Sequence, residues 1–155
     1  MSNLSKTPLE FRTNTSRDLI GIVIIRILVG APLGLVGGFI GNIFNGILVP
    51  SPAAGDFVAF LSRMIVFGIG ASLGSLMSWF NLFESRRGVA IIVAVGTVGG
   101  VVGSMIAYYI GSSYIDHPDV YILNQRLTQT VILGTALGAN LALSGLAYFL
   151  ARTAR

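Results

Sequence analysis

The only histidine of this sequence, His117, lies in the segment Tyr114-Ile-Asp-His-Pro-Asp119. An imidazole can ligate a metal ion or the magnesium of a pigment, and Asp116 and Asp119 could share a metal with it. The same residues are typical of a turn, because aspartate favours turn geometry and Pro118 fixes φ. One histidine with two loop acids has poor metal-site spacing. We therefore expect a turn and no metal site, with a pigment or metal ligand at His117 as the alternative.

Asparagines are the most polar side chains inside the long apolar segments of the sequence, at Asn42, Asn45 and Asn140. Their amides could line a polar path for an ion or solute, or form hydrogen bonds between helices. No Asp or Glu falls within these segments, whereas proton relays and cation-coupled carriers usually place one at mid-membrane. We therefore expect interhelical hydrogen bonds and keep the polar path as the alternative.

Three arginines, Arg26, Arg63 and Arg126, each stand immediately before an apolar segment. Buried among helices, such a residue could bind an anion or an anionic lipid head group. At the membrane surface its long side chain only extends to the head groups. We expect the second situation, while Arg63 and Arg126 could line one vestibule together.

Arrangements that catalysis requires are missing from the sequence. There is no cysteine and hence no thiolate nucleophile or thiolate metal ligand. No Ser-His-Asp set, paired carboxylates or His/Glu metal spacing can be recognised, and the glycine-rich motifs do not follow a strand. We expect a protein that is not an enzyme and needs no cofactor, with bound lipid and the option of a bound pigment.

The composition is that of a membrane protein. Hydrophobic residues make up 54% of the chain and charged residues 10%, against about 25% charged residues in a typical soluble domain. Basic residues outnumber acidic ones, ten to six, but they stand at the edges of apolar segments, as in membrane proteins. We therefore expect no nucleic-acid partner.

Cutting the sequence at its charged residues leaves four apolar segments of about 20 residues, the length that crosses a bilayer as a helix. They cover residues 27–48, 64–83, 89–110 and 127–150. The apolar residues 19–25 either lengthen the first helix or lie in the interface. We predict a polar N-terminal segment over 1–18, a transmembrane domain over 19–150 and a basic tail over 151–155.

The distribution of positive charge predicts an orientation. Of the ten Lys and Arg residues, Arg63 and Arg126 alone fall on one side of the four segments. The other side holds both termini and the connection containing Arg86 and Arg87. Because Lys and Arg concentrate in cytoplasmic segments, we predict a multi-pass membrane protein with both termini in the cytoplasm or its equivalent.

The pattern G-x-V-G-G-x-x-G occurs twice, beginning at Gly34 and at Gly96, each time within an apolar segment. Gly70-x-x-Leu-Gly74 likewise recurs as Gly134-x-x-Leu-Gly138. These matches predict a duplication, with one repeat over about 19–83 and the other over about 88–150. Each repeat holds two spans, so both would enter the membrane in the same direction. The expected fold is an all-α bundle of four transmembrane helices in two tandem hairpins.

Glycines four residues apart lie on one helix face and let two helix backbones approach closely. The first and third segments each carry two such rows. We expect these two helices to form the centre of the bundle and to keep one face for a partner. The predicted helix-packing glycines are Gly30, Gly34, Gly37, Gly38, Gly41, Gly70, Gly74, Gly96, Gly99, Gly100, Gly103, Gly134 and Gly138.

The motifs identify no known family. Abundant close-packing surface without intramembrane acids predicts a non-catalytic integral membrane subunit that packs against partner proteins in a larger complex. The alternative is a small dimeric channel or carrier for an ion or small solute, with the asparagines on its path. The expected partners are other integral membrane subunits or a second copy, together with membrane lipids.

Overall fold

Helices make up nearly all of the described chain. The computed structural model describes residues 16–48, 57–79, 86–115 and 118–153. They form α1 (Ser16–Leu48), α2 (Phe57–Trp79), α3 (Arg86–Tyr114) and α4 (Val120–Thr153), with no strand in these ranges. The all-α prediction is confirmed, and each predicted segment falls mainly on one helix. Because α1 begins at Ser16, residues 19–25 lengthen the first helix.

Three helices are long and apolar enough to cross a membrane. The candidate spans are Val23–Phe44 in α1, Gly88–Tyr114 in α3 and Ile122–Leu150 in α4. In α2 the described apolar stretch, Leu61–Leu76, is shorter than the about 20 residues that span the hydrocarbon core. The three longer helices indicate a membrane protein, and a fourth crossing by α2 stays a prediction.

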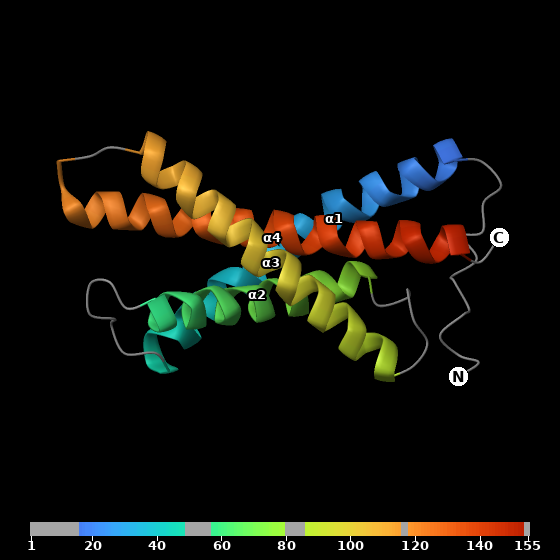
Figure 1. The fold of residues 1–155 in the computed structure, drawn as a ribbon, viewed down its shortest axis with the longest axis horizontal. Coiled ribbons are helices and arrows are strands. Elements are labelled where there is room, and N and C mark those ends of the chain that lie inside the picture. Colours follow the sequence, from blue (N-terminus) through green and yellow to red (C-terminus); the bar gives the residue numbers. More distant parts are fainter. Residues whose placement is uncertain (1–15, 49–56, 80–85, 116–117, 154–155) are drawn as a thin grey trace.

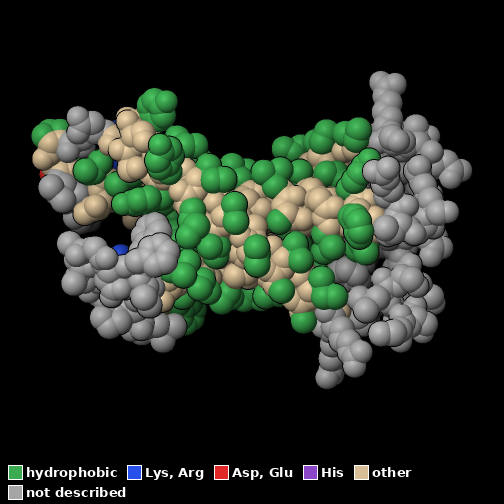
Figure 2. Space-filling model, viewed as in Figure 1, with side chains coloured by type: hydrophobic (Ala, Val, Ile, Leu, Met, Phe, Trp, Pro, Cys, Tyr) green, Lys and Arg blue, Asp and Glu red, His purple; other side chains and the backbone are tan. Residues whose placement is uncertain are grey.

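The outer surface of the helices is apolar. Large hydrophobic side chains are exposed on every helix, among them Leu28 and Ile43 on α1, Leu73 on α2, Val98 and Ile106 on α3, and Leu141 on α4. Figure 2 shows hydrophobic side chains across the middle of the visible face, while the few visible Lys and Arg atoms lie toward its left end. Soluble monomers rarely expose apolar surface on this scale, whereas hydrocarbon is a suitable solvent for it.

The four helices run alternately up and down. In Figure 1, α1 and α3 begin, and α2 and α4 end, toward the right of the molecule. The most extensive interfaces join α1 to α2 and α3 to α4. The described helices therefore associate as two antiparallel hairpins packed against each other.

The centre of the bundle is formed by α2 and α4. These two helices contact each other and both remaining helices, whereas α1 and α3 barely touch. Over an 18-residue stretch of each candidate span, 50% of the residues are buried in α4, against 28% in α1 and 22% in α3. The prediction that the first and third helices form the centre is therefore wrong.

The glycine rows of α1 explain this arrangement, because they face two different helices. A Cβ atom built on Gly37 would overlap the carbonyl oxygen of Gly70 in α2. One built on Gly38 would lie 3.0 Å from Cγ2 of Ile132 in α4. The glycine rows of α1 therefore lie against α2 and α4. These two helices, and not α1, are the central ones.

The two rows of α3 are also divided between α4 and α2. A Cβ atom built on Gly99 would lie 2.6 Å from the carbonyl oxygen of Gly138 in α4, and one on Gly96 would lie 2.7 Å from Cβ of Ser72 in α2. Both rows of both helices are thus occupied within the chain. The glycine rows therefore pack within the chain, and a partner that also contacts one of them stays a prediction.

Candidate functional site

A buried polar cluster joins three helices around Asn140. The Asn140 amide donates hydrogen bonds to Ser75 Oγ and to the carbonyl of Ala136, each at 2.9 Å. Ser75 Oγ in turn donates to the carbonyl of Gly30 at 3.3 Å. Both polar side chains are fully buried, and the bonds connect α4 to α2 and α2 to α1. This is the geometry of interhelical hydrogen bonding in a low-dielectric interior.

Asn42 lies in a different part of the bundle. It lines a pocket beside Leu127 of α4, and Asn140 is roughly 20 Å further along that helix at 1.5 Å per residue. Between these two positions α4 buries the apolar Ile132 and Ala136, and the buried Thr135 hydroxyl donates to the carbonyl of Val131 in its own helix. The described asparagines therefore do not form one continuous polar line. The side chain of Asn45 lies outside the described residues.

Arg26 is bonded to α2. Its Nη1 donates to the carbonyl of Ser78 at 2.7 Å, and Ser78 Oγ donates back to the carbonyl of Arg26 at 2.9 Å. The Ser78 carbonyl is one of the last four of α2, which no helical N–H satisfies. A guanidinium at this end also stabilises the helix dipole. The Arg26 side chain of α1 therefore binds the C-terminal end of α2, and these two hydrogen bonds connect the helices.

Arg63 lines a polar pocket near the opposite ends of the helices. This pocket, here called the Arg63 pocket, has a volume of about 340 Å³. Its lining residues come from all four helices: Asn42, Arg63, Met64, Phe67, Tyr108, Asn124, Leu127, Thr128 and Val131. The Nε atom of Arg63 is buried and has no hydrogen-bond partner among the described residues. Arg126 is exposed and does not line this pocket, so the two arginines do not share it.

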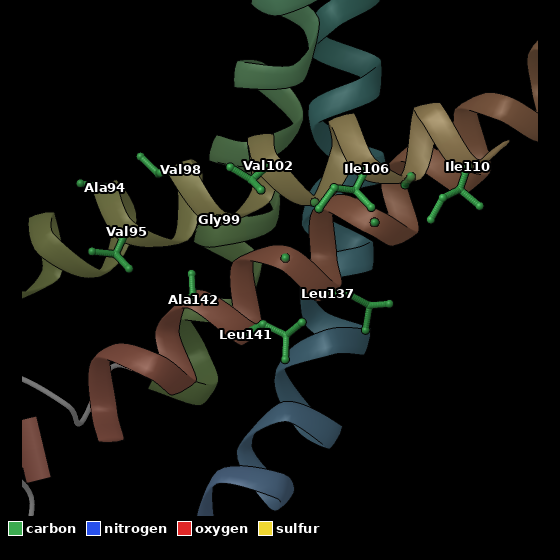
Figure 3. A pocket seen from close by; sticks show the side chains of 14 residues that line it. Ala94, Val95, Val98, Gly99, Val102, Ile106, Ile110, Leu137, Leu141 and Ala142 are labelled. Carbon is green, nitrogen blue, oxygen red and sulfur yellow. The ribbon is translucent and has the colours of Figure 1, made fainter. Parts of the chain in front are cut away.

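An apolar groove runs along α3 and α4, and its volume of about 740 Å³ is larger than that of the Arg63 pocket. Small residues such as Gly99, Gly138 and Ala142 line it together with bulkier side chains such as Val102 and Leu141 (Figure 3). All its lining side chains are apolar. The groove, here called the α3/α4 groove, is therefore suited to hydrocarbon, either an acyl chain or an apolar helix.

The predicted turn is described only in its second half. His117 and Asp116 lie outside the described residues. Asp119 is exposed and precedes α4, where its Oδ1 accepts a hydrogen bond from the backbone N–H of Ile122 at 3.4 Å. This is the position and bonding of a helix N-cap. Asp119 therefore has a local structural role at the start of α4.

Sequence reasoning did not find Tyr108, Asn124 and Thr128 as members of a pocket, nor the α3/α4 groove. The pocket residues stand near helix ends, where isolated polar side chains are common and carry no motif. The groove had a recognisable signal, because Val98, Val102 and Ile106 repeat every four residues beside a glycine row. Side chains four residues apart form a ridge on a helix, and this ridge lies beside the face that carries Gly99 and Gly103.

Comparison of the chain with protein-family models, with curated proteins and with solved structures gives no match.

Proposed function

We propose that this protein is a non-catalytic integral membrane subunit that packs against other membrane proteins in a larger complex. The observation that carries the proposal is the α3/α4 groove, an open apolar surface with small residues at its base. Helices associate in lipid through close van der Waals packing, and small residues permit that approach. A ridge of apolar side chains on a partner helix would fit this groove.

The exposed residues along the groove, not the glycine rows, form the partner surface in this proposal. Val98 is 65% exposed and Leu141 61% exposed. The glycines beneath them are already in contact across the α3–α4 interface. A glycine substitution would therefore disturb the fold itself, so the test must change the exposed residues.

We further propose that the two hairpins arose by duplication. Gly37 packs near Gly74 in the first hairpin as Gly99 packs near Gly138 in the second. These glycines hold corresponding places in the two sequence repeats. The pairing supports parallel repeats about an axis along the membrane normal. The excess of Lys and Arg on one side supports placing both termini in the cytoplasm.

Val98→Trp tests the subunit proposal, because the indole would fill the α3/α4 groove. Val36 is a matched control: it holds the corresponding place in the first repeat and is 58% exposed, but it does not line this groove. We expect Val98→Trp to lose proteins that co-purify with the wild-type chain in mild detergent, and Val36→Trp to retain them. Equal retention by both variants would overturn the proposal.

A dimeric channel or carrier is the second candidate, supported by Asn42 and Arg63 lining one pocket. If it holds, protein in liposomes should give an ion or solute flux that Asn42→Leu changes. Flux equal to that of empty liposomes would remove this candidate.

A further inference from the structure

We infer that the Arg63 pocket binds an anionic group, a phosphate or a carboxylate, carried on a lipid head group or on a small soluble molecule. The inference is independent of any partner protein. It depends on the charge, the hydrogen-bonding capacity and the position of this pocket.

The described lining of the pocket carries a positive charge. Among the described residues that line it, Arg63 is the only charged one. The half-buried side chain keeps its Nε away from solvent and without a hydrogen-bond partner among the described residues. A buried donor that lacks a partner is unfavourable, and the other N–H groups of this guanidinium are the donors available to an anion in the pocket.

The geometry of the guanidinium selects the chemistry of the ligand. Its N–H donors form a planar fork that matches two oxygens of a phosphate or carboxylate. Asn42, Asn124 and Thr128 also line the pocket, and each can donate a hydrogen bond to an oxygen. Because these residues belong to α1 and α4 while Arg63 belongs to α2, the complete set exists only in the folded bundle.

The position and size of the pocket favour an anion attached to a larger molecule. Arg63 lies near the start of α2 and Asn124 near the start of α4, so both are close to helix ends. Phe67, Leu127 and Val131 supply an apolar wall. A volume of about 340 Å³ is in the range of pockets that hold small organic ligands. A phospholipid head group would present its phosphate to Arg63 and its glycerol and chain carbons to the apolar wall.

Arg126 provides a matched control for Arg63. Both stand directly before the apolar part of the second helix of a hairpin, but Arg126 is exposed and absent from the pocket lining. Removing either charge changes the net charge equally. Only the Arg63 change removes the buried Nε donor.

The test is binding of short-chain phosphatidylglycerol to the full-length protein in neutral detergent. Short-chain phosphatidylcholine and inorganic phosphate are titrated in parallel, against the wild type and the variants Arg63→Gln, Arg63→Lys and Arg126→Gln. We expect wild type and Arg126→Gln to bind phosphatidylglycerol more tightly than phosphatidylcholine. We expect Arg63→Gln to weaken phosphatidylglycerol binding about tenfold or more, the effect of losing a charged hydrogen bond.

Arg63→Lys is a conservative control for misfolding. It keeps the positive charge but lacks the planar guanidinium and its Nε donor. Reduced phosphatidylglycerol affinity in this variant, with unchanged thermal unfolding, would support the inference. Arg63-dependent binding of inorganic phosphate would also support it and would identify a soluble anion as the source. Equal affinity of wild type and Arg63→Gln for both phosphatidylglycerol and inorganic phosphate would overturn it.

Discussion

Asn140 is a buried residue whose side chain bonds both to another helix and to its own. Its amide bonds to Ser75 Oγ, which bonds to the Gly30 carbonyl, so that one short chain of hydrogen bonds links three helices. In a membrane such bonds stabilise modestly, because the separated helices can find other partners. The cluster therefore specifies which faces of the helices meet more than it adds to stability.

Asn140→Ala should lower the free energy of unfolding in detergent by about 1–2 kcal/mol, because it removes the bond to Ser75. Thr130→Ala is the control on the same helix, since Thr130 Oγ1 donates only to the carbonyl of Arg126 in its own helix. The free energies of unfolding of the two variants are compared by denaturant titration, monitored by circular dichroism. Equal stability of the two variants would contradict this role for Asn140.

At the scale of the helices, glycine contacts determine how closely α1 approaches α2. Cβ atoms on Gly37 and Gly70 would each overlap the other residue's carbonyl oxygen. Backbone atoms cannot shift aside as a flexible side chain can. The close contact between these helices thus depends on the absence of two side chains.

Gly37→Ala should destabilise the protein by about 1–3 kcal/mol, the usual result of overpacking. Gly21→Ala on the same helix is the control, because nothing lies within 4 Å of a Cβ atom built there. That change should be neutral or stabilising by up to about 1 kcal/mol, since alanine is the better helix former. Thermal unfolding in detergent measures both, and a tolerated Gly37→Ala would disprove the packing described for α1 and α2.

The sequence allowed the helices to be predicted well, because apolar length and flanking charge depend on residues close together in the chain. The glycines four residues apart also predicted close packing, and several of them lie against a neighbouring helix. It did not predict that α2 and α4 lie at the centre, because a row such as Gly34/Gly38 does not say which helix faces it. That depends on how the two hairpins dock.

The Arg63 pocket was predictable only in part, for the same reason. Arg63 and Asn42 attract attention as polar residues, the first directly before an apolar segment and the second inside one. Their meeting with Asn124 and Thr128 depends on the rotation of three helices about their own axes. Nothing local in the sequence fixes those rotations.

At the scale of the whole molecule, orientation in the membrane can be tested with single cysteines, because the chain has none of its own. We predict that Ser113→Cys, near the end of α3, reacts with a membrane-impermeant maleimide on intact cells. Ser85→Cys, in the connection between α2 and α3, should react only after permeabilisation. The reverse labelling pattern would place the termini on the opposite side.

The apolar exterior is the property of the whole molecule that most directly bears on its function. Lipid by itself can cover exposed side chains such as Val98 and Leu141. In our proposal, a helix of a partner protein occupies the α3/α4 groove. Whether that groove is occupied by a partner decides between an accessory subunit and a protein that acts by itself.

The most direct measurement is purification of the wild-type protein from its native membrane in mild detergent, followed by size determination, mass spectrometry and an absorption spectrum. We predict that the protein migrates with a larger assembly and that other integral membrane proteins co-purify in fixed proportion. Migration as a monomer or small oligomer, with lipid alone, would contradict the subunit proposal and favour transport.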